Sequence, residues 1–164
     1  MPCGMTRTNA LLSAVLIATL AACGRDPAIP SSARDLAMEQ VGFGTYRSTQ
    51  FMEKARLIIH DQQTWQQAWA KIDSQSEPPA TDFETQMIVL AAMGSRTHGG
   101  FTIALNDIAA TRDTLYVSVL ETSPGGTDCV YSALLVAPVA LTRVERVDDS
   151  VQFLEHTQTT TNCR

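Results

Sequence analysis

The clearest periodic pattern in the chain is a helical stripe near its middle. Aspartate is a residue type that caps helix N-termini, and Asp61 is followed by four apolar residues spaced three and four apart, with glutamines between them. These apolar residues are Trp65, Ala68, Trp69 and Ile72. The pattern predicts one early amphipathic helix over about residues 62–72, with both tryptophans on the face that packs against the rest of the domain.

Most of the remaining sequence consists of short apolar or alternating segments separated by turn residues. Thr85–Met93 is almost continuously apolar, which predicts a central strand covered on both faces. Glycine, proline and aspartate clusters, such as Gly94–Gly100, separate the segments. The expected strands are Glu53–His60, Thr85–Met93, Phe101–Ile108, Leu115–Val119, Cys129–Val136, Ala140–Val147 and Val151–His156.

These elements together predict an α+β fold. We expect a mostly antiparallel β-sheet of six or seven strands, with the one early helix packed on it. Residues 39–164 are expected to form a single domain, because a chain of this length can bury one sizeable core. Its last segment, Thr157–Arg164, is a polar tail with almost nothing to bury.

The N-terminus has a different pattern, in which an uncharged apolar run follows a short segment whose one cation is Arg7. The run is too short to span a bilayer as a permanent helix, as in a signal peptide. It ends in Leu20-Ala21-Ala22-Cys23, which resembles the bacterial lipobox, where the cysteine is acylated and becomes the first mature residue. We expect residues 1–22 to be a lipoprotein signal peptide, starting at Met1 or Met5. The alternative is a soluble secretory signal with a chance cysteine.

Residues 23–38 are rich in proline, serine and alanine and predict a lipidated flexible tether. By analogy with Gram-negative lipoproteins, in which aspartate after the cysteine causes retention at the inner membrane, Gly24 favours delivery to the outer membrane. We therefore expect a cell-envelope protein, lipid-anchored outside the cytoplasm through Cys23. In a Gram-negative cell it would sit on the outer membrane, facing the periplasm.

Charge narrows the range of partners. The chain has 12 Lys and Arg residues against 17 Asp and Glu residues, a formal net charge of −5, and its only lysines are Lys54 and Lys71. Nucleic-acid binding depends on clustered basic residues, so nucleic acid is not an expected partner. An acidic chain also has no charge-based attraction to anionic lipid, which leaves the acyl groups as its hold on the membrane.

Two of the four cysteines, Cys129 and Cys163, remain once Cys3 is removed with the leader and Cys23 is acylated. Outside the cytoplasm such a pair is expected to form a disulfide. Two free thiols or an intermolecular bridge are the alternatives. No CxxC or HxxxH spacing accompanies either cysteine, so no metal site is expected.

The sequence has no pattern typical of catalysis, and we expect neither an enzyme nor a cofactor. The three histidines, His60, His98 and His156, are not spaced as metal ligands. The segment His98-Gly99-Gly100 is similar to the His-Gly-Gly stretch of some lipase oxyanion holes, but no Gly-x-Ser-x-Gly nucleophile motif accompanies it. A glycine hairpin turn is the simpler interpretation.

The order of these motifs resembles the PrcB-type accessory subunits of protease complexes. The resemblance covers roughly Leu57–His156, and its most specific part is Gly94–Phe101, which is similar to the family's Gly-x-Arg-x-x-Gly-Gly-Tyr turn. Val119–Gly125 resembles the family's valine-rich strand that enters a Pro-Gly loop. This chain departs from the pattern at Phe101, where tyrosine is usual, and at His98, where a small residue is common.

The resemblance implies a non-enzymatic surface lipoprotein that supports the assembly or stability of a secreted protease complex or another envelope complex. An alternative is a protease inhibitor or a small-ligand-binding envelope lipoprotein. Loops held by a rigid sheet are where binding usually resides, and two glycine-containing loops combine an exposed cation with aromatic rings. The candidate partner-binding residues are Arg96, Thr97, His98, Gly99, Gly100, Phe101, Pro124 and Gly125.

Lipid attachment can be tested directly at Cys23. We expect the mature protein to begin at Cys23 and to carry acyl groups, because the apolar run ends in a lipobox-like tetrapeptide. Intact mass of the membrane-extracted protein, or labelling with a clickable fatty acid, measures this. A Cys23→Ser protein that still matures and stays in the membrane fraction would contradict the prediction.

A disulfide between Cys129 and Cys163 would close a long loop and hold the polar C-terminal tail. The chain-entropy model gives about 4 kcal/mol for a loop of this kind, which is a large fraction of the 5–15 kcal/mol or so of net stability that is typical of a domain. Peptide mapping without reduction measures the bond. If both thiols alkylate freely in the denatured, unreduced protein, the disulfide does not exist.

Overall fold

The computed structural model describes residues 28–47, 49–126 and 130–160. The expected signal peptide, the acylated Cys23 and both Cys129 and Cys163 lie outside these residues, so lipid attachment and the disulfide stay predictions. No helix in the described part is long and apolar enough to cross a membrane. The elements are β1 (Arg34–Asp35), β2 (Glu39–Tyr46), β3 (Lys54–Ile59), α1 (Gln62–Ile72), β4 (Gln86–Met93), β5 (Thr102–Ala110), β6 (Thr114–Pro124), β7 (Val139–Glu145) and β8 (Ser150–Thr160).

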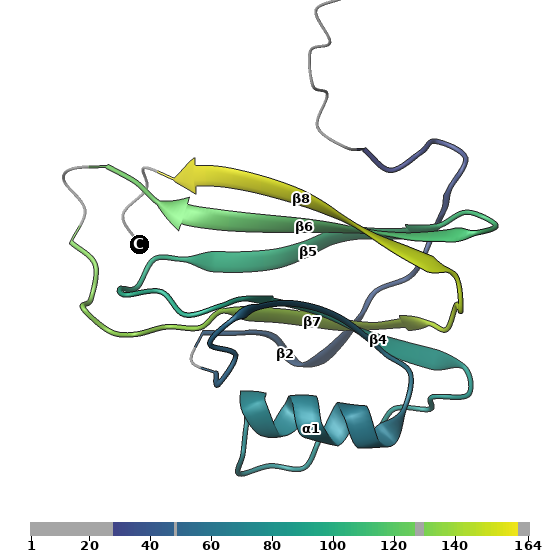
Figure 1. Ribbon diagram of the computed structural model, residues 1–164, viewed down its shortest axis with the longest axis horizontal. Helices are drawn as coiled ribbons and strands as arrows, with labels where there is room; N and C mark the ends of the chain where they lie inside the picture. The colour runs from purple at the N-terminus through teal and green to yellow at the C-terminus, as the bar shows by residue number, and fades with distance from the viewer. Residues whose placement is uncertain (1–27, 48, 127–129, 161–164) are drawn as a thin grey trace, which may run out of the picture.

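The strands form two four-stranded sheets stacked face to face, with α1 as a third layer (Figure 1). The strand orders are β1-β5-β6-β8 in one sheet and β2-β7-β4-β3 in the other. The α+β class with a single helix is confirmed, whereas the expectation of six or seven strands in one sheet is wrong. The physical reason is burial, because inward-facing residues on β5 and β6 need a cover that one short helix cannot provide.

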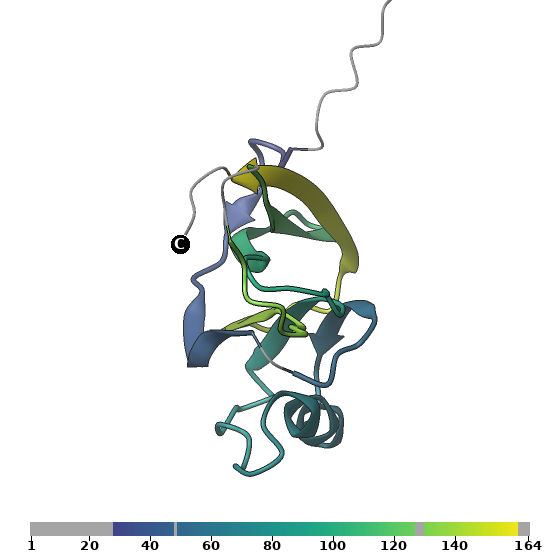
Figure 2. The ribbon, with the colours of Figure 1, turned by 90° about the vertical axis from the view of Figure 1, so that its left-hand side faces the viewer.

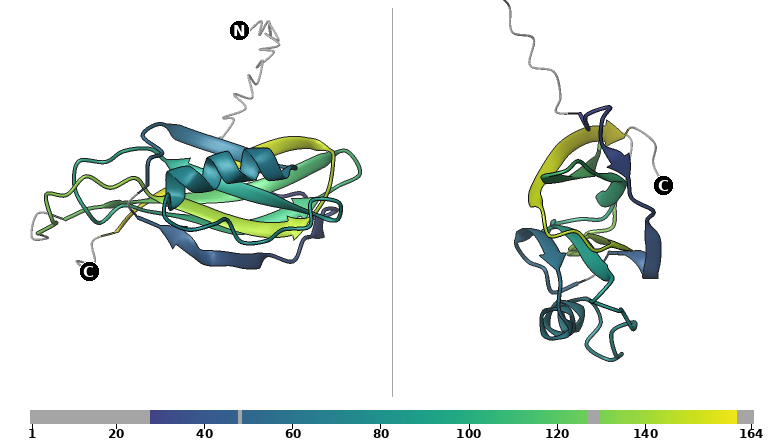
Figure 3. Two further views of the ribbon diagram at one scale, coloured as in Figure 1. Left: turned by 90° about the horizontal axis from the view of Figure 1, so that it is seen from below. Right: turned by 90° about the vertical axis from the view of Figure 1, so that its right-hand side faces the viewer.

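The helix begins and ends where the sequence predicts. The carboxylate of Asp61 accepts a hydrogen bond from the backbone N–H of Thr64 at 2.8 Å, and this bond lowers the pKa of Asp61. Trp65 and Trp69 are buried against the second sheet, and α1 lies along that sheet in the left view of Figure 3. Both indole N–H groups donate to backbone carbonyls of the following loop, those of Pro79 and Ser76.

Strand β4 lies at the centre of the molecule and is covered on both faces, as predicted. Met87, Val89 and Ala91 belong to the core between the two sheets. Ile88, Leu90 and Ala92 belong to the core between the second sheet and α1. The strand pairs antiparallel with β3 on one side and with β7 on the other.

The polar C-terminal segment is a strand and not a free tail through Thr160. Strand β8 pairs in parallel with β6 from Thr114↔Ser150 to Pro124↔Thr160 without a register shift. The pairing is parallel because β7, which lies between them in the chain, belongs to the other sheet and runs back along the molecule. Beyond His156 the strand has no apolar side chain to bury, and backbone hydrogen bonds hold residues 157–160 in place.

Two further expectations about strands need correction. No strand forms at 130–135 in the segment Cys129–Val136, and Val136 makes only an isolated bridge with Arg96. Apolar composition alone suggested a strand there, but these residues form the loop that joins the two sheets. Strand β2 was not expected, because Gly42 and Gly44 interrupt its alternation.

The folded part of the chain also extends into the residues that were expected to form a tether. Arg34 and Asp35 pair with Ala110 and Ala109 of β5, and Leu36 is buried in the core between the sheets. The domain therefore begins before residue 39. A two-residue strand with one buried leucine carries too weak a periodicity to be recognised in the sequence.

Candidate functional site

The candidate binding loops meet at one end of the sandwich. We call this region the loop end and define it as residues 94–101, 124–126 and 130–136. It lies at the left in Figure 1 and faces the viewer in Figure 2. At this end β4 leads into β5, β6 ends, and the chain crosses from the first sheet towards β7.

Backbone hydrogen bonds hold the pieces of the loop end together. Arg96 and Val136 exchange two of them, at 2.7 and 3.0 Å, and the N–H of Gly99 donates to the carbonyl of Ser132 at 2.9 Å. The hydroxyl of Tyr131 donates to the carbonyl of Gly125 at 3.3 Å. The structure thus brings the two predicted loops together, and the segment 130–136 connects them.

Gly100 shows why this turn needs glycine. Its φ is +91°, and a Cβ at this position would lie 2.6 Å from the ring of Tyr131. The glycine therefore allows a close approach between the two loops. The expected turn with glycine at a positive φ is present, but the hairpin interpretation is wrong, because this segment joins β4 of one sheet to β5 of the other. Binding at the loop end has to come from the side chains around the turn.

Three rings and a cation cluster beside this turn. The ring of His98 stacks on Tyr131, with centroids 5.7 Å apart, and lies 5.0 Å from the ring of Phe101. The guanidinium of Arg96 sits over Phe101 at 5.6 Å and donates one hydrogen bond to the carbonyl of Ser95. This cluster packs the two loops against each other through polarisable groups.

Large aliphatic side chains project from the same end. Val130 is 97% exposed, Leu134 60% and Leu135 55%. Val130 and Leu134 line a cavity of about 230 Å³, together with Arg47, Phe101 and other residues of the loop end. Contiguous exposed apolar surface rimmed by polar groups is typical of interaction sites.

The remaining candidate residues have less prominent positions. Thr97 is exposed at the tip of its loop, and Pro124 ends β6 opposite Thr160. The N–H of Gly125 donates to the carbonyl of Thr160 at 2.7 Å. Gly125 thereby fixes the end of β8 against the loop end.

Nothing in the geometry of the loop end is typical of a catalytic site. Within the described residues, His98 Nδ1 makes its hydrogen bond with the carbonyl of Gly99 at 2.8 Å, and no carboxylate orients the ring. No group of three His, Cys, Asp or Glu residues in the described ranges could hold a metal ion.

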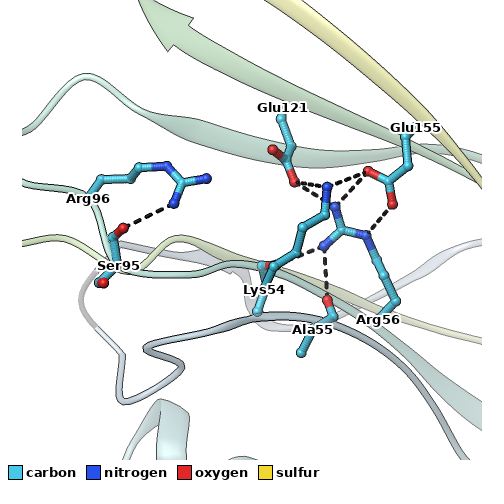
Figure 4. A network of polar contacts seen from close by, with 8 residues as sticks. Lys54, Ala55, Arg56, Ser95, Arg96, Glu121 and Glu155 are labelled. Atoms are coloured by element: carbon cyan, nitrogen blue, oxygen red, sulfur yellow. Dashed lines mark hydrogen bonds and ion pairs between the residues drawn. The ribbon is translucent and has the colours of Figure 1, made fainter.

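A second cluster, which the sequence analysis missed, lies between the sheets where the apolar core ends. We call it the ion network and define it as Lys54, Arg56, Glu121 and Glu155 (Figure 4). It joins three strands, because the first two residues are on β3, Glu121 is on β6 and Glu155 is on β8.

Arg56 is at the centre of the ion network. Its guanidinium donates to Glu121 at 2.6 Å, to both carboxylate oxygens of Glu155 at 2.7 and 2.8 Å, and to the carbonyls of Ala55 and Ala92. Its side chain is only 11% exposed, whereas that of Lys54 is 50% exposed. The buried charge of Arg56 is therefore satisfied on every side by acceptors.

The contacts of the ion network shift the pKa of two groups. Burial disfavours the charged form of Arg56, but its hydrogen bonds to Glu155 and Glu121 outweigh burial and raise its pKa. The hydrogen bonds that Glu155 accepts from Arg56 lower the pKa of Glu155, because they favour the ionised carboxylate. Both shifts favour the charged forms of Arg56 and Glu155.

The sequence did contain a signal for the ion network. Alternate residues of β6 face the inter-sheet core, and these are Leu115, Val117, Val119 and Glu121. The last of them is charged, although its position in the alternation predicts an apolar residue. The same change from an apolar to a charged residue occurs on β3 between Ile58 and Arg56, and on β8 between Phe153 and Glu155. One such residue suggests only the end of a strand, and the three are recognised as a cluster only once the strands are placed side by side.

Arg56→Met and Lys54→Met form a matched pair that tests the energetic role of the ion network. Removing Arg56 leaves the buried carboxylate of Glu121 without its shortest ion pair, and we expect a loss of about 3–5 kcal/mol in the free energy of unfolding. Removing the half-exposed Lys54 should cost no more than about 1 kcal/mol. Urea unfolding measures both, and equal losses would contradict this account.

The same two variants should differ in how their free energy of unfolding depends on pH. Because the pKa of Glu155 is lower in the folded than in the unfolded chain, its stabilising effect is complete above the ordinary glutamate pKa of about 4.3. The effect is lost as the pH falls through the lower folded-state value. We expect the loss of stability in acid to be shallower in Arg56→Met than in the unsubstituted protein, with Lys54→Met closer to the latter.

Comparison with known proteins found no relative of this chain. No family model matches the chain, and searches of curated proteins and of solved structures likewise gave no match.

Proposed function

We propose that this protein is a non-enzymatic interaction domain of the cell envelope, held at the membrane through acylated Cys23, and that it supports a protease complex or another envelope complex. The proposal combines the lipobox-like N-terminus with the resemblance to PrcB-type subunits. The loop end is its partner-binding surface.

The observation that carries the proposal is the exposure of Val130, Leu134 and Leu135 on one short segment. Exposing three aliphatic side chains together has no benefit for folding, since each forgoes the stabilisation that burial provides. They sit beside the aromatic cluster, which can supply contact area at low cost in conformational entropy. This combination of aliphatic and aromatic groups supports a protein partner.

The position of the loop end also supports this function. Its backbone is held by hydrogen bonds to β8 and between the loops, so it is organised before a partner arrives. Pre-organisation reduces the entropy lost on binding. In addition, the guanidinium of Arg96 forms no ion pair with a carboxylate in the described part of the chain, which leaves its charge available to a partner.

The alternative functions make different demands on the same surface. A cavity of about 230 Å³ is smaller than the 300–1,000 Å³ or so that is typical of small-molecule sites, which supports a protein over a small ligand. A protease inhibitor would use the loop end as well. An inhibitor is distinguished from an accessory subunit by an activity assay, because adding the purified protein would lower the activity of the captured protease only if the protein is an inhibitor.

The experiment is a pull-down from detergent-solubilised envelope with the full-length protein. We expect Leu134→Ser combined with Leu135→Ser to reduce capture of the partner at least tenfold, while Arg96→Ala and His98→Ala weaken it to a smaller extent. Val151→Ser is the matched control, because it removes an exposed aliphatic side chain near the start of β8, at the opposite end of the sandwich. Melting temperatures show whether each variant folds. Undiminished capture by the folded double variant would overturn the proposal.

A further inference from the structure

A second exposed apolar feature lies on β2, outside the residues that define the loop end. Phe43 is 82% exposed, although it is part of a strand. Pairing between β2 and β7 shifts register between Gln40 and Thr45, so the residues around Phe43 form a bulge. The bulge turns the phenylalanine outward, while the nearby Val41 is buried against α1 and its sheet.

The backbone of the bulge requires glycine on both sides of Phe43. Gly42 has φ +56° and Gly44 has φ +71°. A Cβ on Gly42 would lie 2.3 Å from the hydroxyl oxygen of Tyr46 and 3.2 Å from the ring of Trp69. Two residues that lose much conformational freedom on folding are thus used to display one apolar ring.

A chain of aromatic contacts holds this ring in position. Phe43 packs edge-on against Tyr46 with centroids 5.9 Å apart, Tyr46 against Trp69 at 5.8 Å, and Trp69 against the buried Trp65 at 5.2 Å. The N–H of Phe43 also donates to the hydroxyl of Tyr46 at 3.2 Å. The exposed ring is therefore connected to the helix core and is pre-organised for contact.

An uncharged cavity lies directly beside Phe43. Its volume is about 300 Å³, and its walls come from β2, β5 and β7 and the residue preceding β2. No lining residue is charged, and the nearest carboxylate on β2, that of Glu39, is paired with Arg143 at 3.2 Å. Its walls combine the apolar residues Met38, Ala104, Leu105 and Leu141 with the polar residues Gln40, Thr45 and Thr142.

We propose that this surface, the Phe43 patch (Phe43 and the adjacent cavity), binds the same surface of a second copy of this chain. A projecting ring next to a cavity is self-complementary, which is what a two-fold interface requires: Phe43 of each copy enters the cavity of the other. The chain carries a net charge of −5, and contact through an uncharged surface brings no like charges of the two copies face to face. The Phe43 patch provides one.

The geometry also indicates how this contact forms and how strong it is. The bulge interrupts the regular edge of β2, so the contact is made by side chains and not by strand addition. A phenylalanine buries about 150–250 Å², and the stable interfaces of unrelated proteins bury about 1,200–2,000 Å². The dimer is accordingly a weak one that depends on concentration.

Complementation between two variants of the full-length protein in detergent tests the proposal. Phe43→Ser removes the projecting ring and keeps the cavity, while Ala104→Trp fills the cavity and keeps the ring. Sedimentation velocity over a range of concentrations should show the unsubstituted protein dimerising and each variant at least tenfold weaker. A mixture of the two should recover association, because one of the two ring-in-cavity contacts forms again.

Val151→Ser controls for the loss of an exposed apolar side chain elsewhere, and circular dichroism confirms that each variant is folded. An unsubstituted protein that stays monomeric at all concentrations, or a Phe43→Ser variant that dimerises as well as Val151→Ser, would overturn the proposal. A photocrosslinking residue at position 43, in cells that carry two differently tagged copies, gives a second measurement. Crosslinks that join the two tags support the dimer, and crosslinks only to another protein contradict it.

Discussion

The double burial of β4 is the constraint on which the rest of the structure depends. Its apolar side chains point alternately to a core shared with the other sheet and to a core shared with α1. A strand of this kind is stable only when both faces are covered. The helix covers one face and the β1-β5-β6-β8 sheet covers the other, so three layers follow from one strand.

The inter-sheet core ends at a defined level, and the ion network marks it. Where the inward positions of β3, β6 and β8 change from apolar to charged, Arg56 joins Glu121 and Glu155 across the gap between the sheets. Buried ion pairs contribute less to stability than their geometry suggests, because desolvation opposes them. We infer that their main effect here is to hold β8 and β6 of one sheet against β3 of the other. The last residue of β8, Thr160, in turn accepts the hydrogen bond that holds Gly125 at the loop end.

The two exposed apolar surfaces differ in how they are built. The loop end displays aliphatic side chains from a segment without regular structure, next to rings and an arginine. The Phe43 patch displays one ring from a bulged strand that an aromatic chain connects to α1. Both are backed by the rigid layers around β4, and the cavities beside them share no lining residue.

The sequence by itself determined the local elements. The period of the tryptophan stripe and the capping aspartate gave the helix over residues 62–72, and the unbroken apolar run of 85–93 gave a strand buried on both sides. These signals are local, because they depend on spacing along one element. The loop residues around Gly100 were also found, since glycine at a turn is a local requirement of the backbone.

Only the tertiary structure decided how those elements combine. Partition into two sheets, the parallel pairing of β8 and the assembly of the ion network depend on which strands become neighbours, and no spacing along the chain encodes that directly. Strand β2 was not expected from the sequence for a different reason: the glycines of its bulge interrupt the alternation that is typical of a strand. The composition of Cys129–Val136 predicted a strand, but in the structure residues 130–135 form a loop that leaves Val130, Leu134 and Leu135 exposed.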